Sequence, residues 1–137
     1  MVNFRYLSNI YNTTYFVYYI NLILDVDNMP SDSIGIFKLN EFTFEKFINK
    51  NKVVLVKFHI PGCQHCVTFK TLYDDLVIKF LMEEAEDVKF AEVNCLEFDS
   101  VEVCSEEGVS GFPALHLYKV RRLENVNSTS ILCIRMA

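Results

Sequence analysis

Two hydrophobic periods alternate along the chain from residue 36 onward. Runs of β-branched or alternating apolar residues predict strands, and apolar residues three or four positions apart predict amphipathic helices. The predicted strands span residues 36–39, 53–60, 88–94 and 114–120. The predicted helices span residues 42–48, 63–83 and 98–107, the last ending before Gly108. Strands that alternate with helices in this way predict an α/β fold with a central sheet covered by helices on both faces.

The second predicted strand is the most apolar part of this pattern. Its sequence, VVLVKFHI over residues 53–60, is almost continuously apolar and is followed by Pro61-Gly62. Such a run is typical of a central strand that is buried on both faces of the sheet. The next predicted helix begins at Cys63, so this cysteine stands at the carboxyl end of a central strand, where sheets of this kind bind their ligands.

The first residues of the chain differ from the rest. Residues 6–24 contain no charged residue, and their apolar part runs from Tyr15 to Leu24. This length fits the apolar region of a secretory signal, and the polar Asn and Thr residues before it disfavour a spanning helix. We therefore predict a signal peptide and a polar linker over residues 1–30, with no stable membrane insertion after cleavage. A signal anchor and an ordinary first helix or strand are the alternatives.

Length, composition and charge narrow the class of protein. The 137 residues are 51% hydrophobic and 23% charged, which indicates one globular domain rather than a disordered chain. The formal net charge is −5, so the surface should repel a polyphosphate and nucleic acid is not an expected partner. We place the folded domain at residues 31–125 and a divergent C-terminal tail at residues 126–137.

The cysteines carry the candidate chemistry. Four of the five fall in two close pairs, Cys63 with Cys66 and Cys95 with Cys104. A Cys-x-x-Cys at a helix N-terminus places the first sulfur near unpaired amides that stabilise a thiolate, and the second sulfur one turn away. We expect Cys63 to be the nucleophile, Cys66 the resolving thiol, and His65 between them to favour the reduced form, which makes the disulfide a better oxidant. The redox group is then the Cys63–Cys66 bond itself, with no other cofactor.

Zinc binding is the alternative use of such a motif. A Cys-x-x-Cys supplies half of many zinc sites, and Cys95 and Cys104 are the candidates for the other half. The eight residues between them do not match a zinc knuckle, and outside the Cys-x-x-Cys motif the sequence has no pair of Cys or His residues as closely spaced as Cys63 and Cys66. We therefore expect no metal site.

Two stretches of the sequence resemble a known family. KVVLVKFHIPGCQHC is similar to the strand, Ala-Pro-Trp turn and Cys-Gly-His-Cys site of the thioredoxin domains of protein disulfide isomerases. AEVNCLEFDSVEVCSEEGVSGFPALHLYK resembles the segment that follows in that family, including its Gly-Tyr/Phe-Pro turn. The resemblance covers about residues 34–120. It implies a thioredoxin fold, an α/β architecture with a central mixed β-sheet flanked by helices.

The resemblance also implies roles for individual residues. Pro113 would be a cis-proline that faces the active-site sulfurs and, with Phe112 and Gly62, contacts the substrate peptide. Some members of the family join cysteines at the places of Cys95 and Cys104, which implies a structural disulfide here. Two buried free thiols are the alternative for this pair.

The sequence departs from the family at several positions. Gly62 stands in place of a Trp, Lys57 in place of a buried acid that shuttles a proton for the second cysteine, Thr71 in place of a helix-kinking proline, and Ala114 in place of a Thr. His59 is either a structural strand residue or a group that tunes Cys63. Residues 130–134 are a candidate last strand, but no segment matches the family's final helix, so we expect a truncated or atypical C-terminal end.

The expected function follows from the paired cysteines and the resemblance. We expect a thiol–disulfide oxidoreductase of the protein disulfide isomerase type that acts on cysteine-containing client polypeptides. Glutathione or an upstream oxidase would restore its disulfide, in the lumen of the endoplasmic reticulum or elsewhere in the secretory pathway. The alternative is a catalytically weak thioredoxin-fold module that binds clients in the manner of a chaperone.

Overall fold

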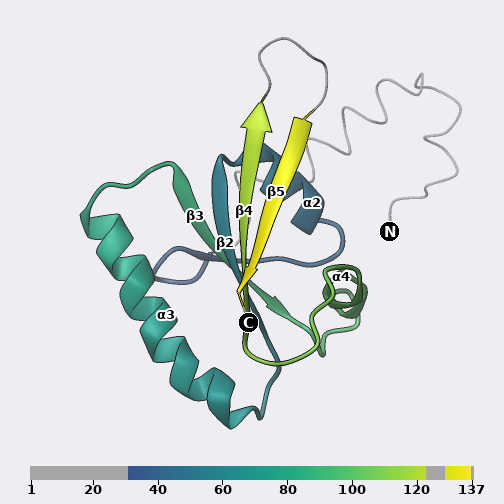
Figure 1. Ribbon diagram of the computed structural model, residues 1–137. Helices are drawn as coiled ribbons and strands as arrows, with labels where there is room; N and C mark the ends of the chain where they lie inside the picture. Colours follow the sequence, from purple (N-terminus) through teal and green to yellow (C-terminus); the bar gives the residue numbers. More distant parts are fainter. Residues whose placement is uncertain (1–30, 123–128, 137) are drawn as a thin grey trace, which may run out of the picture.

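The computed structural model describes residues 31–122 and 129–136 (Figure 1). The predicted signal peptide and linker, residues 1–30, lie outside the described part of the chain. The strands are β1 (Ile36–Lys38), β2 (Val53–His59), β3 (Val88–Asn94), β4 (Ala114–Arg122) and β5 (Thr129–Met136). The helices are α2 (Phe44–Lys50), α3 (Gln64–Met82) and α4 (Val101–Glu106). The predicted alternation of strands and helices is confirmed.

The strands form one mixed sheet in the order β1-β3-β2-β4-β5. β3 pairs in parallel with both β1 and β2, whereas β4 is antiparallel to β2 and to β5. β2 therefore lies at the centre, as its apolar run predicts, and its buried residues extend from Val54 to Phe58. Its carboxyl end leads directly into the turn before α3, which places Cys63 at that end of the sheet.

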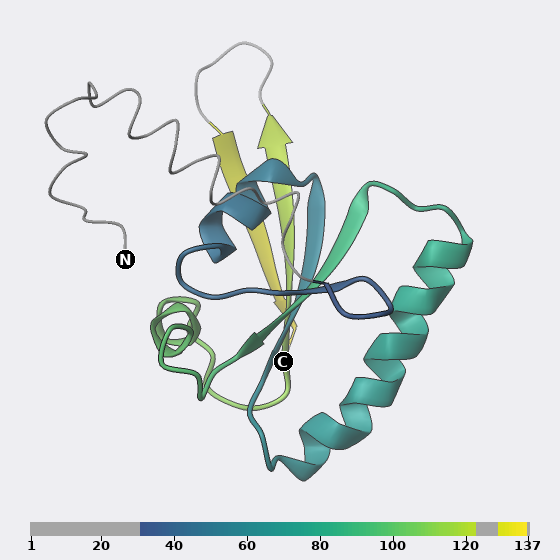
Figure 2. The ribbon, with the colours of Figure 1, turned by 180° about the vertical axis from the view of Figure 1, so that it is seen from behind.

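The two faces of the sheet carry separate apolar cores. The α2/α4-side core contains Phe44, Phe47 and Ile48 of α2, Val103 and Cys104 of α4, and the β2 residues Val54, Val56 and Phe58. The α3-side core is smaller and contains Ile36, Leu55, Tyr73, Val77 and Phe90. Figures 1 and 2 show α3 running along one face and α2 with α4 on the other. Alternate residues of β2 thus point to different helices.

Local hydrogen bonds set the helix bounds a few residues away from the predicted ones. α2 begins at Phe44 rather than residue 42, because the Asn40 side chain accepts hydrogen bonds from the Phe42 amide (3.1 Å) and the Thr43 hydroxyl (3.0 Å) and holds a turn there. α4 begins at Val101 rather than residue 98, because the Asn94 carboxamide oxygen accepts from the Leu96 amide at 3.2 Å. In both loops an Asn side chain accepts hydrogen bonds from residues two or three positions later, and the turn that this forms lengthens the loop before the helix.

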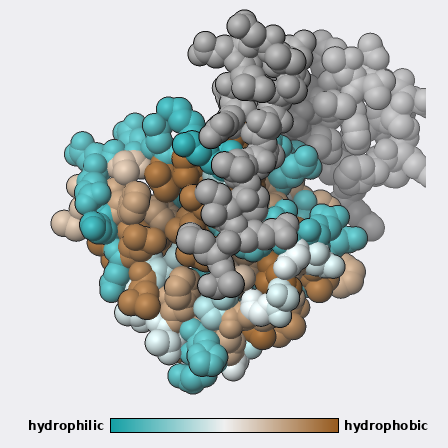
Figure 3. Space-filling view, viewed as in Figure 1, coloured by the Kyte–Doolittle hydropathy of each residue, from teal (hydrophilic) through white to brown (hydrophobic). Residues whose placement is uncertain are grey.

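The predicted last strand is present and pairs with β4 along its whole length, from Leu115 opposite Met136 to Arg122 opposite Thr129. Among the described residues, α3 is the only helix on its face of the sheet. Leu115 and Leu117 of β4 are half-buried there and pack against the α3-side core. In Figure 3, apolar side chains are visible over the surface of this face.

Candidate active site

The two cysteines of the Cys-x-x-Cys motif lie at the start of α3. Cys63 is the N-cap residue of this helix, and its sulfur accepts a hydrogen bond from the Cys66 amide at 3.1 Å. The two sulfurs are bonded to each other, with the Cα atoms 5.2 Å apart. Cys63 is half-exposed, whereas Cys66 is 7% exposed. A sulfur at a helix N-terminus lies next to the positive end of the helix dipole, which stabilises the thiolate form of that sulfur.

Gly62 leaves the surface beside Cys63 open. It is exposed and adopts a φ of +78°, a left-handed conformation that L side chains rarely take. A Cβ atom built on it would meet nothing within 4 Å. The missing Trp of the family therefore has no substitute at this point in the described structure, and the Cys63 side of the disulfide is accessible.

A cis peptide bond lies against the disulfide. The bond between Phe112 and Pro113 is cis, and the Phe112 carbonyl oxygen is 3.9 Å from the Cys63 sulfur. Both residues are half-buried and come directly before β4, which runs beside β2. The sheet thus brings the Gly62-Cys63 segment close to the Phe112-Pro113 segment, which lies about 50 residues later in the sequence.

The remaining predicted site residue is His65. It lies in the first turn of α3, between the two cysteines, and is exposed. Within the described residues its ring makes no hydrogen bond or ion pair, so its influence on the cysteines comes from proximity along the helix alone. Its role stays a prediction.

The second cysteine pair is also bonded. Cys95 and Cys104 have their Cα atoms 5.8 Å apart and are each 5% exposed. The bond joins the residue after β3 to the middle of α4, within the α2/α4-side core. The Cys95 amide donates a hydrogen bond to the His59 carbonyl at 2.8 Å, so this loop is attached to the end of β2. A bond in this place fixes the loop between β3 and α4 next to the carboxyl end of β2.

A buried charge pair lies at the carboxyl end of β2. The Lys57 ammonium is 2.9 Å from a carboxylate oxygen of Glu92, and their side chains are 4% and 16% exposed. Glu92 is the register partner of Lys57 on the neighbouring strand β3. The Lys57 ammonium also lies 4.9 Å from the centre of the Tyr73 ring of α3. Lys57 therefore does not replace the family's buried acid by an isolated cation, because Glu92 supplies a carboxylate from the next strand.

His59 belongs to the same charge cluster. Its Nε2 atom lies 3.8 Å from the carboxylate oxygen of Glu92 that also binds Lys57. Burial lowers the pKa of His59 from 6.5, the nearby Lys57 lowers it further, and Glu92 opposes both. The sequence singles out His59 but gives no partner for it. Glu92 was missed altogether, since its place beside Lys57 follows only from the strand order and register.

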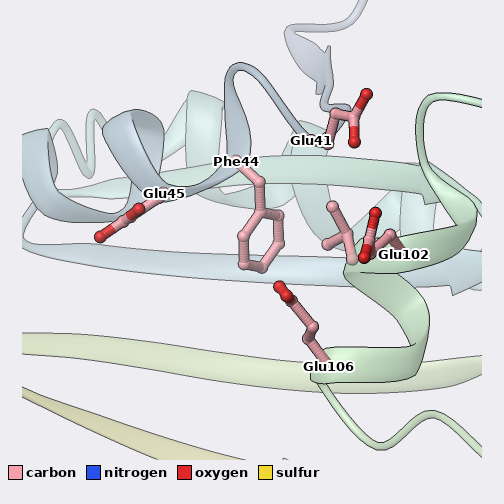
Figure 4. A pocket seen from close by; sticks show the side chains of 6 residues that line it. Glu41, Phe44, Glu45, Glu102 and Glu106 are labelled. Carbon is pink, nitrogen blue, oxygen red and sulfur yellow. The ribbon is translucent and has the colours of Figure 1, made fainter.

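A surface pocket lies between α2 and α4, and no residue of the cysteine motif lines it. Its volume is about 250 Å³, and it is bordered by Glu41, Phe44 and Glu45 on one side and Glu102, Val103 and Glu106 on the other. Figure 4 shows the carboxylates of these elements around the Phe44 ring. No lining residue is a cysteine, and such a set of like charges disfavours an anionic ligand.

No helix in the described part of the chain has the length and apolar character needed to cross a membrane. Residues 31–122 and 129–136 contain no group of three or more His, Cys, Asp or Glu side chains arranged to hold a metal ion.

Comparison with known proteins places these features in a family. The sequence profile of the family Thioredoxin matches residues 35–130. The chain is 35% identical over 98 residues to Protein disulfide-isomerase 1 of Caenorhabditis elegans, covering 72% of this chain and 20% of that protein. It is 37% identical over 89 residues to Protein disulfide isomerase-like 2-1 of Oryza sativa subsp. japonica, covering 65% and 23%. The chain thus spans about a fifth to a quarter of the length of these relatives.

Solved structures agree on the fold. The Trx4 domain of ERdj5 superimposes with a TM-score of 0.61 at 21% sequence identity, covering 74% of this chain and 82% of that domain. The first two thioredoxin domains of Naumovozyma dairenensis Eps1p give a TM-score of 0.55 at 25% identity, over 66% of this chain and 33% of theirs. The mixed sheet and the helices that cover it are therefore arranged as in thioredoxin domains.

Proposed function

Because this chain belongs to the thioredoxin family and is similar to protein disulfide isomerases, we propose that it exchanges disulfides with cysteine-containing client polypeptides. The observation that carries the proposal is the position of Cys63. Its sulfur caps α3 and lies beside the cis Phe112–Pro113 bond, 3.9 Å from the Phe112 carbonyl oxygen. A half-exposed sulfur in such a place is able to act as a thiolate nucleophile.

The exchange proceeds through a mixed disulfide. When the pair is reduced, the Cys63 thiolate attacks one sulfur of a client disulfide, and the other client sulfur leaves as a thiolate. Cys66 then attacks the Cys63 sulfur, which re-forms the Cys63–Cys66 bond and releases the second client thiolate. The client gains two electrons and two protons, and the pair loses them. The reverse sequence oxidises a client dithiol.

The client would bind along the residues that border Cys63. Phe112 and Pro113 are half-buried, so part of their surface remains available to an extended peptide. The open space at Gly62 leaves a path to the Cys63 sulfur. We propose these three residues as the contact surface for the client, with the Cys95–Cys104 bond as a structural support.

The proposal also covers the preferred direction of the exchange, the re-oxidation of the Cys63–Cys66 pair and the cellular location of the protein. His65 lies between the cysteines and favours the thiolate, which makes the oxidised pair a better oxidant. Glutathione or an upstream oxidase would restore the disulfide, and no further cofactor is needed. The apolar stretch within residues 6–24, together with the similarity to protein disulfide isomerases, supports entry into the secretory pathway and a place in the lumen of the endoplasmic reticulum.

A rate comparison tests the proposal. The measurement is the reduction of insulin by a thiol reductant, with wild type, Cys63→Ser or no protein added. We expect wild type to accelerate the reaction and Cys63→Ser to lose that acceleration. Equal rates for the two proteins would contradict the exchange activity and leave the alternative, a module that binds clients without turning them over.

A further inference from the structure

The Cys66 thiol needs a base when it resolves the mixed disulfide, and the geometry of β2 and α3 brings basic side chains of β2 close to the level of Cys66. Cys66 is 7% exposed, and burial raises the pKa of a thiol in apolar surroundings. Only the thiolate attacks a disulfide. A buried group that accepts its proton would therefore decide how fast Cys66 reacts at neutral pH.

The side chains of β2 that point toward α3 follow from the two cores. Val54, Val56 and Phe58 belong to the α2/α4-side core, whereas Leu55 belongs to the α3-side core. Since successive side chains of a strand alternate between faces, Lys57 and His59 point to the α3 side as well. The contact of the Lys57 ammonium with the Tyr73 ring of α3 agrees with this placement.

The hydrogen bonds of Tyr73 fix the position of Cys66 relative to Lys57 and His59 along β2. The Tyr73 hydroxyl donates to the carbonyls of Leu55 and Ala91, each at 2.8 Å, so Tyr73 lies at the level of Leu55. α3 then runs against the direction of β2 (Figure 1). Lys57 and His59 lie about 7 and 13 Å beyond Leu55 along the strand. Cys66, seven residues before Tyr73 in a helix that rises 1.5 Å per residue, lies about 10 Å beyond it. Cys66 therefore comes between the levels of Lys57 and His59.

Of the two basic side chains on either side of Cys66, only His59 is free to take a proton. The Lys57 ammonium is bound to Glu92 at 2.9 Å, and an ammonium has no acceptor. The His59 Nε2 faces the same Glu92 carboxylate at 3.8 Å, which leaves Nδ1 for the proton and a negative charge to stabilise the imidazolium. We propose that His59, held against the Lys57–Glu92 pair, accepts the Cys66 proton as Cys66 resolves the mixed disulfide.

The step is balanced within the proposed exchange, on which this inference rests. The proton passes from the Cys66 sulfur to His59, the thiolate attacks the Cys63 sulfur, and the bond from Cys63 to the client breaks. The client leaves as a thiolate, and His59 returns its proton to that thiolate through solvent. His59 is a proton acceptor that acts through Cys66 and does not bind the client.

The charges around His59 are consistent with this role. They are Lys57 on its own strand, Glu92 on β3, Glu97 in the loop after β3, and Lys38 on β1. Over the same row, α3 carries Cys66 and the Lys70–Asp74 pair, and β4 presents Leu115 opposite Lys57. Burial keeps the pKa of His59 below 6.5, so its ring is neutral and able to accept a proton at pH 7.

A two-phase reaction separates the two cysteines. Reduced protein is mixed with the chromogenic disulfide dithiobis(nitrobenzoate); Cys63 releases the first nitrothiobenzoate, and Cys66 releases the second when it attacks the mixed disulfide. Every protein in this experiment, the reference included, carries Cys133→Ser, so that this further cysteine of β5 does not react. The rate of each phase is recorded against pH for this reference protein, called wild type below, and for His59→Gln.

We expect His59→Gln to move the pH midpoint of the second phase upward by about one unit or more, a slowing of about tenfold or more at pH 7, and to leave the first phase unchanged. Lys38→Gln removes a charge from the same row without removing a base, and its second phase should stay within about twofold of wild type. An unchanged second phase in His59→Gln, or an equal slowing of both phases, overturns the proposal. If wild type releases no first nitrothiobenzoate, the proposed exchange itself is wrong.

Discussion

The two disulfides of this chain lie at the same end of the sheet in opposite surroundings. Cys63 is half-exposed at a helix N-terminus, beside an open glycine and above a row of charged side chains. Cys95 and Cys104 are each 5% exposed and belong to the α2/α4-side core. The same covalent bond is accessible to a thiolate in one case and shielded in the other. The surroundings, rather than the bond, therefore separate a redox site from a structural crosslink.

The largest expected effect is on activity and concerns the exposed pair alone. Replacing Cys63 by Ser removes the nucleophile, and we expect thiol–disulfide exchange to fall by roughly a thousandfold or more. The double variant Cys95→Ala/Cys104→Ala should keep most of the exchange rate, since neither sulfur is accessible. Insulin reduction measured on both proteins checks this. A similar loss in the two would contradict the division of roles.

The next effect concerns the charged row, which consists of Lys57, His59 and Glu92 near the Cys63–Cys66 pair. Glu92→Ala leaves the Lys57 ammonium buried without its carboxylate, and we expect a loss of about 3–5 kcal/mol in the free energy of unfolding. The double variant Lys57→Met/Glu92→Leu removes both charges and should be close to wild type in stability. Urea unfolding of the three proteins makes the measurement. A loss below about 1 kcal/mol in Glu92→Ala would mean that water reaches Lys57.

The buried pair should contribute to stability by closing a short loop. Cys95 and Cys104 are nine residues apart, and the chain-entropy estimate for a loop of this size is about 2.7 kcal/mol. We expect Cys95→Ala/Cys104→Ala to lower the free energy of unfolding by roughly that amount. The same unfolding experiment on Cys63→Ala/Cys66→Ala is the matched control. A larger loss in the control would reverse the comparison.

The smallest effect comes from the open glycine. Gly62→Ala meets no atom within 4 Å but must keep a φ of +78°, so we expect a loss of about 1 kcal/mol. Gly111→Ala is the matched control, because its Cβ also meets nothing and its φ is not positive. Thermal unfolding compares the two. Equal stability of both variants would mean that the turn before Cys63 takes another conformation.

Much of this arrangement is readable from the sequence because it is local. The apolar run of β2, the helix that starts at the cysteine motif and the turn at Pro61-Gly62 depend on neighbouring residues, and all are found where the pattern places them. The helix bounds shift by two or three residues where Asn40 and Asn94 bond to nearby groups. Such competition between a side chain and the helix leaves only a weak signal in the pattern.

The charged row is not readable in the same way. Lys57 looks like the loss of a buried acid until β3 is known to run parallel to β2 with Glu92 opposite Lys57. The two residues are 35 positions apart, and their pairing depends on strand order and on a register that a shift of one residue would abolish. The partner of His59 is hidden for the same reason.

The most direct test is a redox titration that follows the two cysteine pairs separately. Wild type is equilibrated in thiol–disulfide buffers of graded potential, free thiols are alkylated, and each cysteine is read by mass spectrometry. We expect Cys63–Cys66 to titrate near −180 mV, the range of disulfide isomerases, while Cys95–Cys104 stays oxidised to below about −300 mV. If the two pairs were reduced together, or Cys95–Cys104 first, the assignment of one pair to exchange and the other to structure would be wrong.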